Sequence, residues 1–181
     1  YLEKDLIINV ASEEVEIALL EDKTLVEFHK DKRGKNLSVG DVYFGTITKL
    51  MPGLNACFVN IGQEREAFLH FTDLGVHFRS FKKYTHITKN KGYKNALLKA
   101  FRFEEETVKT DKIENLVKSG DQLIIQVEKE PISTKGARVS AEVSIPGRFF
   151  VLCPFQDHIN VSKNISTAKE RKRILRLTES I

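Results

Sequence analysis

The chain has few of the residues that build disulfides and metal sites. Its 181 residues include only two cysteines, Cys57 and Cys153, which lie far apart in apolar stretches. They form no CxxC or Cys/His spacing, so the sequence predicts no metal site. Apolar stretches with free thiols are typical of proteins in a reducing compartment, and we therefore expect a cytoplasmic protein.

The sequence also lacks the familiar signatures of catalysis. Its five histidines have neither metal nor triad spacing, and there is no Walker phosphate loop or GxSxG elbow. The densest group of carboxylates is Glu104, Glu105 and Glu106. Neighbouring side chains point in different directions, so this run favours a solvated face over a metal site. We expect no catalytic residue in this chain.

Long hydrophobic runs are absent as well. No apolar segment approaches the roughly 18 residues that a membrane-spanning helix needs, so the sequence predicts no membrane span. The contents of 41% hydrophobic and 30% charged residues are typical of a globular protein. The chain begins at Tyr1 rather than Met and ends just after a run rich in Lys and Arg. We therefore expect it to be part of a longer protein.

Positive charge is concentrated in one segment. The net charge is +4, yet residues 77–112 hold ten Lys or Arg against four Asp or Glu. Within this segment, aromatic residues alternate with lysines over 77–84, and 93–103 has helical spacing. Aromatics among cations suit single-stranded nucleic acid. They equally suit a helix that docks its apolar face on the protein and leaves its lysines in water.

Turn residues divide the rest of the chain into short strands. Three strands are predicted at 5–10, 15–20 and 24–29, before a polar linker at 30–38. Further strands are predicted at 42–51, 54–61, 65–70, 122–130 and 137–145, then at 148–154, with a helix at 167–176. This pattern predicts a mainly β fold with some α. Its centre is a five-stranded OB-fold barrel with a long insertion between strands 3 and 4, at about 72–119.

Two phenylalanines stand out within these strands. Side chains alternate faces along a strand, so if Cys57, Val59 and Ile61 point inward, Phe58 points outward. The same alternation turns Phe68 outward. Exposed rings on a small barrel indicate a platform for stacked bases. The alternative, that both rings belong to the core, stays open because both strand faces are partly apolar.

Several of these segments carry a resemblance to a known family. Gly45, the run 56–59, Gly62 and the run 66–70 resemble the S-one RNA-binding domain, as does 135–140 for its closing strand. Three longer phrases are similar to the amino-terminal part of the bacterial RNase E/RNase G endoribonucleases: DLIINVASEEVEIALL at 5–20, ITKLMPGLNACFVNIGQEREAFL at 47–69, and QVEKEPISTKGARVSAEVSIPGRFFVL at 126–152. The insertion is a departure, because those enzymes have a shorter segment there.

The resemblance implies a set of site residues. It implies RNA contacts at Phe58, Phe68, His70, Lys135 and Arg138, and Lys49 and Arg65 flank the same face. For His70, the alternative is a hydrogen-bonding cap at the strand end. Gly147 and Val151 match residues beside the pocket for the RNA 5′ end, which would be only partly present here.

The resemblance also implies an organisation and a function. Residues 1–37 would be amino-terminal strands of a split RNase H-like domain, 38–145 the OB domain, and 146–181 the start of a 5′-sensor region. The catalytic aspartates and the cysteine zinc link belong to later domains of those enzymes. We therefore expect no cofactor in this chain, and Mg²⁺ with structural Zn²⁺ only in the whole protein.

The expected function is single-stranded RNA binding by part of an endoribonuclease that acts in rRNA processing and mRNA decay. Its partners would be RNA and the remainder of its own chain, with a homo-oligomer as one form of the whole enzyme. Two alternatives stay open. One is a stand-alone RNA-binding protein, and the other is a protein-interaction module that meets an acidic partner.

Overall fold

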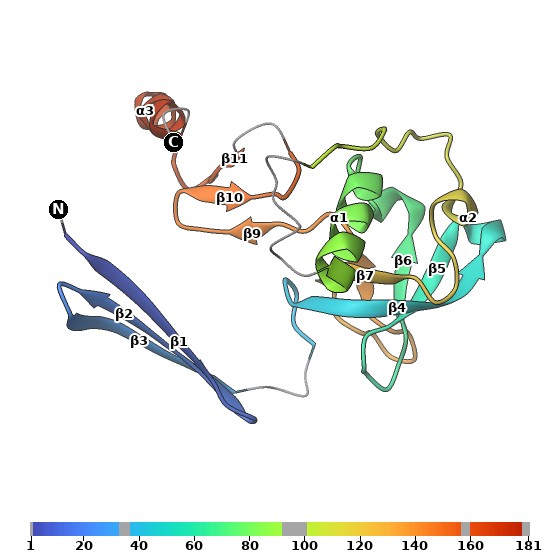
Figure 1. Ribbon diagram of the computed structural model, residues 1–181, viewed down its shortest axis with the longest axis horizontal. Coiled ribbons are helices and arrows are strands. Elements are labelled where there is room, and N and C mark those ends of the chain that lie inside the picture. Colours follow the sequence, from blue (N-terminus) through green and yellow to red (C-terminus); the bar gives the residue numbers. More distant parts are fainter. Residues whose placement is uncertain (1, 33–36, 92–100, 157–159, 179–181) are drawn as a thin grey trace. The chain divides into compact units, whose positions relative to one another are not determined.

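The chain divides into two compact units, which are described separately. The computed structural model describes residues 2–32, 37–91, 101–156 and 160–178. The first unit comprises Tyr1–Asn36 and the second Leu37–Ile181. Strands dominate both units (Figure 1).

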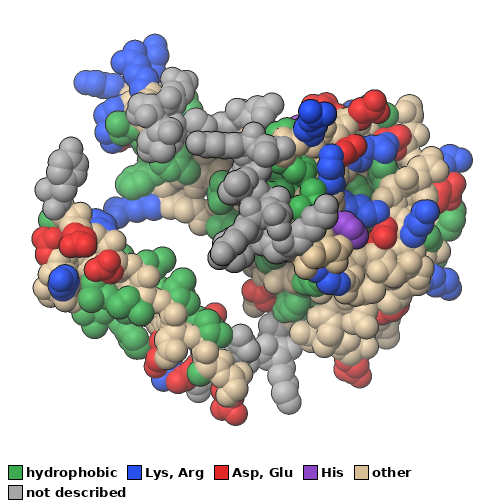
Figure 2. Space-filling view, in the orientation of Figure 1, with side chains coloured by type: hydrophobic (Ala, Val, Ile, Leu, Met, Phe, Trp, Pro, Cys, Tyr) green, Lys and Arg blue, Asp and Glu red, His purple; other side chains and the backbone are tan. Residues whose placement is uncertain are grey.

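The first unit is a three-stranded antiparallel sheet in the order β1-β2-β3. Its strands are β1 (Lys4–Val10), β2 (Glu14–Glu21) and β3 (Thr24–Lys32), close to the three predicted strands. Asp22 and Lys23 form the β2–β3 turn with φ of 46° and 64°, the left-handed conformation of a tight hairpin. Figure 2 shows hydrophobic side chains gathered on the surface of this sheet. The large apolar residues that stay exposed on it are Leu6, Ile7, Ile8, Val10, Leu25, Val26 and Phe28.

The second unit contains a closed five-stranded barrel in the order β4-β5-β6-β8-β7. Its strands are β4 (Val42–Met51), β5 (Ala56–Asn60), β6 (Ala67–His70), β7 (Gln122–Lys129) and β8 (Arg138–Ser140). The ladders are antiparallel except for β6 with β8, which are parallel and close the barrel. The predicted mainly β fold with a five-stranded OB-type barrel is confirmed.

The last barrel strand is shorter than predicted. The expected strand at 137–145 ends at Ser140. There the chain leaves the ladder, because the backbone N–H of Ala141 donates to the Asp73 carbonyl at 2.8 Å. Ser144 is then fixed by its backbone N–H, which donates to Gln126 Oε1 at 2.9 Å. After Ser140, hydrogen bonds to a loop carbonyl and to a side chain thus replace the sheet hydrogen bonds of the longer strand that the sequence predicted.

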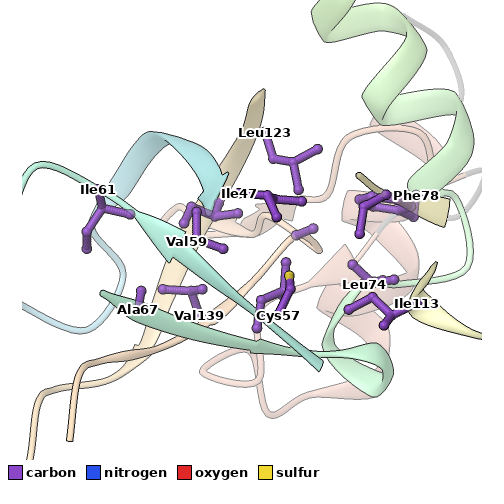
Figure 3. Close-up of a cluster of buried hydrophobic side chains, with 14 of the residues drawn as sticks. Ile47, Cys57, Val59, Ile61, Ala67, Leu74, Phe78, Ile113, Leu123 and Val139 are labelled. Carbon is purple, nitrogen blue, oxygen red and sulfur yellow. The ribbon is translucent and has the colours of Figure 1, made fainter. Parts of the chain in front are cut away.

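The barrel interior is filled by one face of each strand. The inward residues on β5 and β6 are those that alternation predicted, and Cys57, Val59 and Leu69 are fully buried. Figure 3 shows the side chains of Cys57 and Val59 beside those of Ile47 and Val139 from the neighbouring strands. Gly45 on β4 must remain small, because a Cβ there would lie 2.5 Å from Val59 Cγ1.

The insertion contains a docked helix. Helix α1 (Phe78–Lys91) follows the short 3-10 turn η2 (Phe71–Asp73), and the one-turn helix α2 (Ile113–Leu116) comes before β7. Phe78 is 2% exposed and lies beside Leu74 and Ile113 at one end of the barrel interior (Figure 3). The helix therefore docks its apolar face on the barrel, which is one of the two expected roles of the insertion.

The position of this helix differs from the sequence prediction. The helical spacing at 93–103 falls mostly on 92–100, which lie outside the described residues, and 101–103 are not helical. The helix lies earlier, at 78–91, where the sequence showed aromatics among lysines. Those aromatics and threonines recur at helical spacing, and their burial against the barrel stabilises the helix.

The end of the chain forms a small sheet and a basic helix. The sheet has the order β11-β10-β9, with β9 (Ile145–Pro146), β10 (Phe150–Leu152) and β11 (Asn160–Val161). Helix α3 (Ala168–Thr178) contacts β11 and lies close to the predicted 167–176. The Arg171 guanidinium donates to the carbonyls of Ser162 and Ile165, which ties the helix to the preceding turn. None of the described helices has the length and apolar content to cross a membrane.

Candidate nucleic-acid interface

An open groove of about 710 Å³ lies on the outer wall of the barrel. It is lined from β5, β6, β8 and two loops by Leu54, Phe58, Arg65, Glu66, Phe68, Thr134, Lys135, Gly136 and Arg138. Five of the predicted RNA-contact residues therefore line a single groove. The lining joins apolar rings with three cationic side chains.

The rings of Phe58 and Phe68 line this groove, and the ring of His70 extends the row beyond the lining residues. Phe58 and Phe68 are cross-strand partners on β5 and β6, and their ring centroids lie 6.0 Å apart at 68°. The ring of His70 follows on β6, 6.4 Å from Phe68 and inclined to it by 25°. Both phenylalanines are half-buried, and neither belongs to the fully buried core. Each ring is thus held by the sheet on one side and open on the other.

His70 ends β6 and caps the turn that follows. The backbone N–H of Thr72 donates to His70 Nδ1 at 3.2 Å at the start of η2. Because Nδ1 accepts this bond, the neutral ring carries its proton on Nε2. The cap that the sequence offered as an alternative is present, and it fixes the ring while leaving the Nε2 side for a ligand.

Arg138 is held by a carboxylate. Its Nε and Nη2 donate to the two carboxylate oxygens of Asp73, both at 2.8 Å. The Asp73 side chain is only 9% exposed, and this contact raises the pKa of Arg138. Glu128 Oε2 lies 3.8 Å from Arg138 Nε. The guanidinium is therefore fixed in orientation, and its charge is offset on one side.

The loop before β8 is folded tightly onto β6. A Cβ at Gly136 would lie 1.8 Å from the Glu66 carbonyl oxygen, so only glycine fits. The backbone N–H of Phe68 donates to the Ala137 carbonyl at 2.8 Å. The Arg65 guanidinium donates to the Ser133 carbonyl across the same junction. This packing places Lys135, which is exposed, at the rim of the groove.

The remaining predicted residues lie outside the groove lining: His70, Lys49, Gly147 and Val151. Lys49 is the cross-strand partner of Phe58 and is exposed, but it does not line the groove. Gly147 and Val151 belong to the β9–β10 hairpin, where the Gly147 N–H donates to the Phe150 carbonyl at 2.7 Å. A role for these two at an RNA 5′ end stays a prediction.

Sequence reasoning missed Asp73 and several lining residues. Asp73 is 65 positions from Arg138, and no local pattern links them. The remaining lining residues that were missed are Leu54, Glu66, Thr134 and Gly136. Leu54, just after the Pro52-Gly53 turn, is a large apolar residue that is 56% exposed. A leucine placed in a turn was the one available signal for it.

Several known proteins are similar to this chain over most of its length. No protein-family model matches the chain. Ribonuclease G of Haemophilus influenzae is 34% identical over 175 residues, which are 97% of this chain and 32% of that protein. Ribonuclease G of Escherichia coli K12 is 31% identical over 94% of this chain and 31% of its own length. Ribonuclease E of Nostoc is 32% identical over 75% of this chain and 16% of its own.

The chain belongs to the ribonuclease E/G family. It spans about a third of the length of the ribonuclease G relatives, and it matches an amino-terminal part of the family. The predicted family resemblance is confirmed. The similarity to the Haemophilus protein extends over 97% of the chain, so both units belong to the matched region.

The described part of this ribonuclease E/G chain does not fit a Mg²⁺ or Zn²⁺ site. Across 2–32, 37–91, 101–156 and 160–178, no three His, Cys, Asp or Glu residues come together as ligands. Burial raises the pKa of Cys57 to about 12, which keeps the thiol protonated and unsuited to a metal. Glu104 is paired with Lys83, so the acidic run lies on a solvated face.

Proposed function

We propose that this ribonuclease E/G chain binds single-stranded RNA in the groove over Phe58 and Phe68. The observation that carries the proposal is the row of three rings, Phe58, Phe68 and His70, beside the cationic rim. Base–aromatic stacking contributes about 1–3 kcal/mol per base in single-strand binding proteins. A ring that the sheet holds on one side loses little freedom when a base covers the other.

The charged side chains would take different roles in this binding. No ion pair involving Lys135 occurs within the described ranges, so its charge is available to a phosphate. Arg138 is oriented by Asp73 and lines the groove, and its remaining N–H groups would donate to the RNA. Nε2 of His70 would donate to a base or phosphate oxygen. Lys49 and Arg65 would add long-range attraction.

The proposal extends to the whole protein through its relatives. Those relatives are named ribonucleases and are about three times longer than this chain. We propose that the whole protein is a metal-dependent endoribonuclease of rRNA processing and mRNA decay in the cytoplasm. It would hold Mg²⁺ and Zn²⁺ in segments beyond this chain and work as a homo-oligomer.

We propose a place for the parts of this chain that flank the barrel. The strands of 1–37 would complete an RNase H-like domain with another segment of the same protein. Their exposed apolar residues support this role, because a sheet needs a covering layer to bury such side chains. Residues 146–181 would begin a sensor of the RNA 5′ end, with Gly147 and Val151 beside its pocket.

The test is a binding assay with fluorescently labelled oligouridine about 12 nucleotides long, within the range of OB-fold sites. Phe58→Ala and Phe68→Ala should each weaken binding by about 1–3 kcal/mol, with little change in melting temperature. Phe44→Ala is the matched control, since Phe44 is 48% exposed on β4 and lines a different groove. Equal losses in all three variants, or a large fall in melting temperature with binding intact, would contradict the proposal.

A further inference from the structure

A second groove, of about 630 Å³, lies between α1 and residues 152–156, over β4 and β7 of the barrel. It shares no lining residue with the RNA groove. Its walls are mostly large apolar side chains: Phe44, Phe81, Tyr84, Ile124, Leu152 and Phe155. Phe44 and Leu152 are 48% and 61% exposed, so the groove presents apolar surface to solvent.

The aromatic rings of this groove pack against one another and against a lysine. Phe155 meets Phe81 at 5.7 Å and Tyr84 at 5.4 Å, both edge to face. These rings hold one another and form a wall. The ring of Phe44 has the Lys89 ammonium 5.6 Å from its centroid. The central ring pair of the RNA groove, Phe58 and Phe68, also meets edge to face, so the polar groups and not the ring angles distinguish the two grooves.

The polar groups of the groove are already used within the protein. The hydroxyls of Thr85 and Thr88 donate to the carbonyls of Phe81 and Tyr84, each at 2.9 Å. The amide of Gln156 donates to Glu142 at 2.7 Å and accepts from Asn160 at 3.0 Å. A base edge would find few partners here and would lose its hydrogen bonds to water. The groove therefore suits apolar side chains better than a nucleotide.

One cation marks the end of this apolar surface. Three other basic side chains of α1 are in ion pairs: Arg79 with Asp111, Lys82 with Asp121, and Lys83 with Glu104. Lys89 instead donates to a neutral amide oxygen, that of Gln122, and no carboxylate partner for it occurs among the described residues. It lies where the apolar groove joins a smaller polar hollow of about 270 Å³ that His86 and Asn90 also line. The surface is thus apolar along its length and positive at one end.

We propose that this groove docks a short peptide segment of a partner protein. The segment would place apolar side chains over Phe44, Ile124 and Phe155, and an Asp or Glu beside Lys89. A helix with apolar residues on one face satisfies both requirements, because its neighbouring face can carry the acid. This proposal does not rest on RNA binding, since the two grooves use different residues.

The test uses a synthetic helical peptide of about 15 residues, a length at which helix becomes marginally stable. Its probe form has leucines on one face and glutamates on the flanks, and a second form has lysines in place of the glutamates. With the whole 181-residue chain, we expect saturable binding of the acidic form. Lys89→Glu and Phe44→Ala should each weaken it by about tenfold or more. Phe58→Ala should leave it unchanged.

A charge swap makes the test decisive. Lys89→Glu should bind the lysine form better than the unmodified chain does, because the attraction is restored with reversed sign. The proposal is overturned if the two peptide forms bind the unmodified chain equally. It is also overturned if oligouridine competes with the acidic peptide and loses affinity on Phe44→Ala. Failure of RNA binding alone would affect only the other groove.

Discussion

Replacing Asp73 with alanine tests whether this carboxylate positions Arg138 for RNA. The change removes both hydrogen bonds to the guanidinium, each 2.8 Å long. It leaves the Asp73 carbonyl in place, which still accepts from Ser140 Oγ at 2.9 Å and from the Ala141 backbone N–H at 2.8 Å. The turn and β8 should therefore stay together.

The size of the effect follows from the exposure of the two partners. Hydrogen bonds to charged groups contribute about 1.5–3 kcal/mol when well shielded. The Arg138 side chain is 40% exposed while that of Asp73 is 9% exposed, so water partly replaces the lost contact. We expect the free energy of unfolding to fall by about 1–2 kcal/mol. The hydrogen bonds to Asp73 raise the pKa of Arg138 further from neutrality, so Arg138 itself should add no pH dependence to stability near pH 7.

A double-mutant cycle with Arg138→Ala measures the pair directly. Urea unfolding followed by circular dichroism should give a coupling of about 1 kcal/mol, with the double variant costing little more than either single one. In the oligouridine assay, Asp73→Ala and Arg138→Ala should weaken binding to a similar degree. If Asp73→Ala strengthens RNA binding, the carboxylate masks the cation instead of positioning it, and the reasoning is wrong.

Three further predictions concern the core, the loop junction and the groove rim. Burial raises the pKa of Cys57 from 9.0 to about 12. Above pH 9 the unfolded thiol therefore ionises first, and the free energy of unfolding should fall by about 1.4 kcal/mol per pH unit. Urea unfolding at several alkaline pH values should show this slope, and Cys57→Ala should reduce it. Gly136→Ala should destabilise the chain by about 1–3 kcal/mol in thermal unfolding, because its Cβ meets the Glu66 carbonyl. An alanine at Gly53, where a Cβ meets nothing within 4 Å, is the control. Lys135→Ala should reduce the slope of log affinity for oligouridine against log salt by about 0.7, the value for one phosphate contact on a single strand. An unchanged slope would mean that Lys135 does not touch the RNA backbone.

The parts of the fold that the sequence predicted are those governed by local alternation. The outward placement of Phe58 and Phe68 follows from the alternation of side chains along a strand. The burial patterns of β5 and β6 agree with it, since buried residues flank each phenylalanine. The start of α1 was missed because its apolar residues alternate with lysines that pair across the fold, as Lys82 does with Asp121. The early end of β8 was missed for a similar reason, since it depends on the distant carbonyl of Asp73.

In the candidate site, too, the residues on predicted strands and turns were found from the sequence, and the contacts between distant residues were not. Its rings and cations lie on strands and turns that short stretches of the sequence predict. Its supporting contacts join residues far apart, as Arg65 with Ser133 and Arg138 with Asp73. Those contacts decide which cation is paired with a carboxylate, and no local pattern in the sequence shows that Arg138 is paired with Asp73.

The parallel pairing of β6 with β8 has a consequence for the order of folding. Phe68 pairs with Arg138, seventy positions later, so the final seam forms only after the whole intervening chain has been brought round. The entropy of closing such a loop grows with the logarithm of its length, about 0.6 kcal/mol for each doubling. Extra residues between these strands therefore cost little stability and mainly slow the search for the seam. Insertions between β6 and β8 should therefore reduce the stability of the closed barrel only slightly.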